Sequence, residues 1–119
     1  MLIPEHHKEI IQAMVAADPE VAQATCDIPH EDPSTYLIEG DAYGSVLPYC
    51  GCFVGVYAWM QECKKGNFVP PYFGIPEVVS EHVGCSASDI SHFAGWCHTP
   101  ERDEEAVRYA RGLLATPNG

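Results

Sequence analysis

Residues 51–65 read GCFVGVYAWMQECKK. Apolar residues recur at helical spacing along two stripes of this segment, so a helix built from it is apolar on almost every side. A helix of that kind belongs in the middle of a bundle, where neighbouring helices cover all of its faces. Lys64, Lys65 and Gly66 then form a common C-terminal signal, with cations at the negative end of the helix dipole. The segment therefore predicts a buried central helix.

Helical patterns precede this central segment. Pro4 suits a first helical position, and His7 falls on the apolar face of the helix that follows it. We expect His7 to be partly buried with its nitrogens satisfied. Asp18 then caps, and Pro19 opens, a second short helix that runs to Thr25.

Three more helical patterns follow the central segment. They cover residues 76–83, residues 86–96 and the chain from Pro100 onward. The last of these carries four acids in its first turns and arginines later, as the helix dipole favours. The sequence thus predicts an all-α fold: residues 1–119 form a single globular domain, a compact bundle of about five helices around residues 51–65.

Residues 26–49 read as an acidic loop region, because prolines and glycines interrupt every pattern except a short strand at 36–38. No Lys or Arg occurs between Lys8 and Lys64. The acids of this region are Asp27, Glu31, Asp32, Glu39 and Asp41. The whole chain has 17 acidic and 6 basic residues, for a net charge of −11. That balance argues against binding nucleic acid or anionic membranes by neutralising phosphates.

Residues 76–96 contain the sharpest local motif. Val79, Ile90 and Phe93 stand where the two helices of a helix-turn-helix meet, and Gly84 stands at the turn. The segment resembles the helix-turn-helix unit of repressor-type DNA-binding proteins. The resemblance implies a helix pair, but the would-be recognition helix has no Lys or Arg and carries Asp89. DNA binding is therefore the disfavoured alternative, and we expect a packing unit.

Six cysteines allow a metal site as an alternative to apolar packing. The best quartet by ligand type for zinc is Cys50, Cys52, Cys97 and His98. Cys52 and Cys63 cannot share an ion, because eleven residues of continuous helix separate them by about 16 Å. The paired-knuckle spacing is also absent, since Cys97 and His98 are adjacent. We therefore expect no metal or other cofactor and thiols packed in the core.

A thiol nucleophile is a further alternative. Cys50 or Cys52 stands near the start of the central helix, where the dipole lowers the pKa of a thiol. His82, His92 or His98 would then serve as the base. Nothing in the sequence fixes the geometry of that base, so we expect a protein that is not an enzyme.

The start of the chain and its longest uncharged stretch bear on its compartment. Residues 1–8 do not read as a signal peptide, because charged residues and histidines interrupt them. Residues 42–61 contain Pro48 and three glycines, so their apolar part is too short for a membrane span. We expect a cytoplasmic protein with reduced thiols and no membrane contact.

The acidic region is the remaining functional lead. One interpretation is a solvated surface that only aids solubility. The more specific interpretation is that this region forms an acidic face that docks on a basic protein surface, such as that of a nucleic-acid-binding complex. The face is centred on Glu31, Asp32, Glu39 and Asp41. By size, charge and helical make-up the chain resembles small acidic phage-encoded inhibitors of host defence, including anti-CRISPR proteins that mimic DNA. The resemblance implies a protein partner and no direct contact with nucleic acid.

Overall fold

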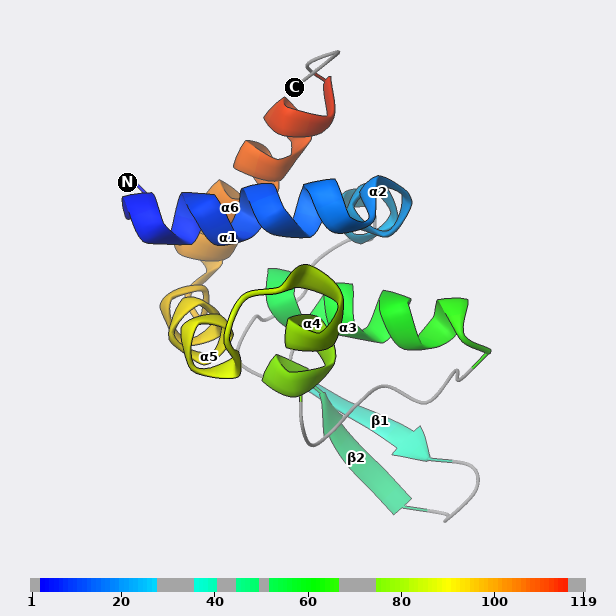
Figure 1. The fold of residues 1–119 in the computed structure, drawn as a ribbon. Helices are drawn as coiled ribbons and strands as arrows, with labels where there is room; N and C mark the ends of the chain where they lie inside the picture. Colours follow the sequence, from blue (N-terminus) through cyan, green and yellow to red (C-terminus); the bar gives the residue numbers. More distant parts are fainter. Residues whose placement is uncertain (1–2, 28–35, 41–44, 50–51, 67–74, 116–119) are drawn as a thin grey trace.

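The computed structural model describes residues 3–27, 36–40, 45–49, 52–66 and 75–115 (Figure 1). These residues form six helices and two strands: α1 (Glu5–Ala17), α2 (Pro19–Asp27), β1 (Tyr36–Gly40), β2 (Ser45–Tyr49), α3 (Phe53–Lys64), α4 (Ile75–Val83), α5 (Ala87–Trp96) and α6 (Pro100–Ala115). The helices pack into one bundle, so the all-α prediction is confirmed for the body of the protein, with six helices in place of about five.

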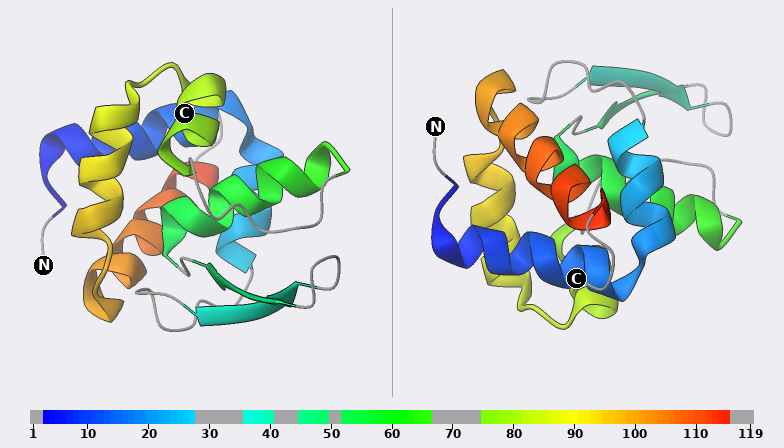
Figure 2. Two further views of the ribbon diagram at one scale, coloured as in Figure 1. Left: turned by 90° about the horizontal axis from the view of Figure 1, so that it is seen from below. Right: turned by 90° about the horizontal axis from the view of Figure 1, so that it is seen from above.

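Helix α3 is the centre of the bundle, as its sequence predicts. It contacts α2, α4, α5 and α6, and Figure 2 shows its N-terminal part among these helices while its C-terminal end projects from the bundle. Residues 53–58 are all buried. The Phe53 ring lies 6.5 Å from the Tyr57 ring and 6.5 Å from the Phe93 ring, between centroids. The Tyr57 hydroxyl donates to the Met14 carbonyl at 2.9 Å, which ties α3 to α1.

Local capping signals set the ends of the helices. The Asp18 carboxylate accepts from the Val21 amide at 3.1 Å, and the Ser86 hydroxyl accepts from the Asp89 amide at 3.1 Å. The Thr99 hydroxyl accepts from the Arg102 amide at 3.3 Å at the start of α6. Gly84 has a φ of 81°, a left-handed conformation that ends α4 and that residues with a side chain rarely adopt.

Strand β1 contains the short strand predicted at 36–38, and strand β2 corrects the prediction that residues 45–49 belong to a loop region. They pair antiparallel, with Tyr36 opposite Tyr49 and Gly40 opposite Ser45. The β-branched, aromatic and leucine residues of both segments favour a strand, and Gly40 ends the first one close to the turn. The hairpin packs mainly on itself and extends away from the helices (Figure 1).

Helices α4 and α5 form the helix pair that residues 76–96 predict. Val79, Ile90 and Phe93 are fully buried at their junction. The Ser80 hydroxyl donates to the Cys85 carbonyl at 2.6 Å and closes the turn around Gly84. The hydrophobic contacts of this pair face the bundle, as in a packing unit.

Candidate functional site

The acidic residues predicted to bind a partner are only partly covered by the described structure. Asp27 is exposed at the end of α2, and its carboxylate accepts from the Gln23 amide at 2.9 Å. The backbone of Glu39 lies in β1 opposite Val46. Glu31, Asp32, Asp41 and the side chain of Glu39 lie outside the described residues.

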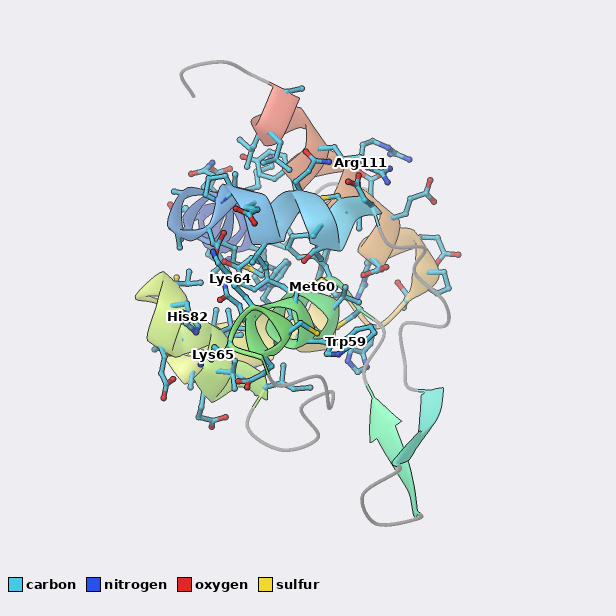
Figure 3. The ribbon with its side chains drawn as sticks, turned by 90° about the vertical axis from the view of Figure 1, so that its right-hand side faces the viewer. Trp59, Met60, Lys64, Lys65, His82 and Arg111 are labelled. Atoms are coloured by element: carbon cyan, nitrogen blue, oxygen red, sulfur yellow. The ribbon has the colours of Figure 1, made fainter. Side chains whose placement is uncertain are left out.

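Asp27 stands where a carboxylate does not stabilise its helix. The C-terminal end of a helix carries partial negative charge, so cations are favoured there and acids are disfavoured. Arg111 of α6, labelled in Figure 3, compensates by donating to the Cys26 carbonyl at 2.6 Å. Asp27 therefore stabilises α2 only through its hydrogen bond with Gln23, and it opposes the dipole of the helix.

All six cations of the chain lie in the described residues and contact other parts of the chain. Two lie over aromatic rings, three form ion pairs with acids, and one caps α2. These contacts are Lys8 with Tyr109, Arg102 with Trp96, Lys64 with Asp18, Lys65 with Glu62, Arg108 with Glu104 and Glu105, and Arg111 with the Cys26 carbonyl. The basic residues are thus occupied within the molecule.

Many exposed carboxylates consequently have no cation within ion-pair distance in the part of the chain that the structure describes. They are Glu5, Glu9, Glu20, Asp27, Glu77, Glu81, Asp89 and Glu101. Their charges face solvent and create a negative potential around the protein. At about 0.1 M salt, this potential extends about 10 Å from the surface before the ions screen it. The surface is therefore suited to a basic partner.

The cysteine alternatives involve buried thiols. Cys52 is the N-cap residue of α3 and Cys97 follows α5, and both are fully buried. His98 is exposed, and Cys50 lies outside the described residues. Across the described ranges, no group of three or more His, Cys, Asp or Glu side chains is arranged to hold a metal ion.

Alkylation of the native protein tests the thiol-nucleophile alternative. Burial raises the pKa of Cys26, Cys63 and Cys85, and Cys52 is inaccessible, so iodoacetamide at neutral pH should leave these four cysteines largely unmodified. Peptide mass mapping of a Cys50→Ser chain measures this, because the variant leaves a single thiol in the Cys50–Cys52 region. The same labelling in concentrated urea should modify every cysteine. Rapid native modification of Cys52 would contradict the prediction.

Asp103 is a buried carboxylate whose role the sequence analysis missed. It is 3% exposed, and its Oδ1 atom accepts from the Phe53 amide at 2.7 Å. It lies in the first turn of α6 and caps the N-terminus of α3, so it meets the positive ends of two helix dipoles. The signal was present: Asp103 is on the same helical face as the buried residues Ala106, Val107 and Ala110.

His7 is also buried, at 5% exposure, but the expectation of satisfied nitrogens is wrong. Neither Nδ1 nor Nε2 finds a hydrogen-bond partner among the described residues. The ring instead packs 5.3 Å from the Phe93 ring and 5.6 Å from the Trp96 ring, between centroids. An apolar, aromatic surrounding of this kind favours the neutral imidazole.

Two results complete the description of the candidate site. None of the described helices combines the length and apolar character needed to cross a bilayer. Comparison with protein families, with characterised proteins and with solved structures finds no match to this chain.

Proposed function

We propose that this chain is a small acidic protein-binding module or inhibitor that docks a carboxylate-rich face on a basic surface of a partner protein. The observation that carries the proposal is the use of the cations: all six contact other parts of the chain, while eight exposed acids of the described residues pair with none of them. A basic partner would supply the missing counter-charges, and complementary potentials would steer the encounter.

The position of the hairpin supports the proposal that the acidic face around Glu39 and Asp41 contacts the partner. Strands β1 and β2 extend from the helical body, and they belong to the stretch between Lys8 and Lys64 that contains no cation (Figures 1 and 3). Glu39 belongs to this hairpin, and Asp41 belongs to the segment that joins its strands. A projecting, negatively charged element can enter a positively charged groove of a partner protein. A channel that binds nucleic acid is a groove of this kind.

Direct DNA binding is a weaker proposal for the same structure. The exposed residues of α5 include Ser88, Asp89, Ser91 and His92, and no cation lies on this helix. Phosphate contacts by Lys and Arg supply most of the non-specific affinity for DNA. A partner protein whose own surface binds nucleic acid suits the charge of this chain, in the manner of anti-CRISPR-like phage inhibitors, and the cytoplasm is the proposed place of action.

Capture from a cell lysate tests the proposal. The immobilised chain should retain one or a few basic proteins after nuclease treatment, and rising salt should release them, because screening weakens attraction between exposed charges. Added duplex DNA should displace the same proteins if the acidic face lies where phosphates bind. Retention that salt and DNA both leave unchanged would contradict electrostatic docking.

A further inference from the structure

The hairpin of β1 and β2 is a sheet of two strands. Within the ranges that the structure describes, β1 pairs with β2 and with no third strand. The two strands pack mainly on each other and extend away from the helices (Figure 1). The outer edge of a strand presents backbone N–H and C=O groups that another chain can pair with. A lone two-stranded hairpin is also only marginally stable in water, so a third strand would stabilise it.

The register of the hairpin shows which backbone groups point outward. Opposite residues in an antiparallel pair alternate between those that exchange hydrogen bonds and those whose N–H and C=O groups face away from each other. Pro48 lies opposite Leu37. Proline has no N–H, so in a sheet its nitrogen faces away from the paired strand. Leu37 and Pro48 are therefore an outward-facing pair, and so are Glu39 and Val46, two positions along the ladder.

The two edges of the hairpin differ in what they offer. The outward positions of β2 are Val46 and Pro48, and the proline removes one of the two donors, which interrupts this edge. The outward positions of β1 are Leu37 and Glu39, and each has both an N–H and a C=O group. Strand β1 is therefore the edge that can continue a hydrogen-bonded ladder.

The charge of β1 indicates what kind of strand suits this edge. Natural sheets protect exposed edge strands from pairing with charged residues, above all with lysine. Strand β1 has no Lys or Arg, contains Glu39, and belongs to the stretch between Lys8 and Lys64 that contains no cation. Its charge is opposite to that of a lysine-bearing edge on another protein. A second copy of this chain is a poorer match, because chains with a net charge of −11 repel each other.

We propose that β1 pairs, through the outward backbone groups of Leu37 and Glu39, with the lysine-bearing edge strand of a sheet in the partner protein. The inference rests on the proposed function, because it states how the basic partner is held. The main-chain hydrogen bonds hold the added strand, and opposite charges on neighbouring strands favour the pairing. Strand β1 then lies between β2 and the strand of the partner.

A synthetic peptide of alternating lysine and valine tests the pairing, because valine favours a strand and lysine supplies the positive charge. Hydrogen exchange of the full chain, followed by NMR, should slow at the amides of Leu37 and Glu39 when the peptide binds. The amide of Ile38 should not change, because in this register it faces β2. Slower exchange at Leu37 and Glu39 that depends on protein concentration without peptide would assign the edge to a second copy and overturn the proposal.

A second peptide separates pairing from charge attraction. It has the same sequence, with N-methyl groups on two adjacent central amides, one facing each edge of the peptide strand. The charge is kept and the donors are lost, so this peptide should bind at least about tenfold more weakly. Equal binding of the two peptides would overturn strand pairing and leave electrostatic docking intact. Failure of both peptides to bind would also overturn strand pairing, whereas electrostatic docking fails only if the lysate capture fails.

Two proline variants locate the edge. Leu37→Pro removes an outward donor from β1, and Val46→Pro removes the equivalent donor from β2. Both positions are of the outward type that already accommodates Pro48, so both variants are compatible with the hairpin. Leu37→Pro should weaken binding of the unmethylated peptide at least about tenfold, and Val46→Pro should leave it unchanged. An equal loss in both variants, or no loss in Leu37→Pro, would overturn the assignment to β1.

Discussion

Replacing Asp103 with alanine should lower the free energy of unfolding by about 2 to 4 kcal/mol. The carboxylate is buried and accepts from the Phe53 amide at 2.7 Å, so its removal leaves a buried N–H without an acceptor at the start of the central helix. The side chain of Cys52, the N-cap residue, does not cap α3. The loss combines a charge-assisted hydrogen bond, a helix cap and a dipole interaction.

Urea denaturation of Asp103→Ala and Glu104→Ala measures this effect. Glu104 is the next residue on α6, and its exposed ion pair with Arg108 contributes about 0.5 kcal/mol or less. A loss in Asp103→Ala no larger than that in Glu104→Ala would show that the carboxylate does not hold α3 and α6 together.

The second large effect is a loss of stability as the pH falls. Burial lowers the pKa of His7 below the ordinary 6.5, and the nearby His6 and His92 lower it further. Between the ordinary pKa and the lowered one, the unfolded chain binds a proton that the folded chain does not. The free energy of unfolding should therefore be fully maintained above pH 6.5 and decrease below it, down to the pKa of the folded state.

Replacing His7 with leucine isolates this contribution. The variant removes two buried nitrogens that have no partners among the described residues, so it should gain about 1 kcal/mol at neutral pH. Its stability should also vary less with pH below 6.5. Exposed His98→Gln, a histidine that does not act on the pKa of His7, serves as the control, with little change at neutral pH. A pH dependence in His7→Leu as steep as that of the unchanged chain would contradict the assignment to His7.

The helices were predictable because their signals are local. Residues 51–65 predicted a buried central helix, and the structure has it at Phe53–Lys64. The caps at Asp18, Ser86 and Thr99 each involve a backbone amide three residues away, so the sequence nearby contains the whole interaction. Strand β2 was missed, because Pro48 and the flanking glycines read as breakers while its pairing depends on β1.

The features that involve distant residues were not predictable in the same way. Asp103 and Phe53 are 50 positions apart, and the acid was assigned to the dipole of its own helix although it lies on the buried face. A pocket at the C-terminal end of α3 is lined by Asp18, Gln61 and His82, which only the packing of α1, α3 and α4 brings together. Of the acidic face, the exposure of Asp27 is confirmed, and the other four residues stay a prediction.

The most direct test of the acidic face compares two variants of equal net charge against the captured partner protein. One reverses Glu31, Asp32, Glu39 and Asp41 to lysine, and the other reverses Glu9, Glu77, Glu81 and Glu101, which are exposed and far along the chain from the hairpin. The first should bind at least about 100-fold more weakly, since each reversal turns an attraction of about 1 kcal/mol into a repulsion. The second should lose much less affinity, because its four acids contribute to the overall negative potential of the chain but lie outside the docking face. Equal affinities of the two variants would contradict docking through this face.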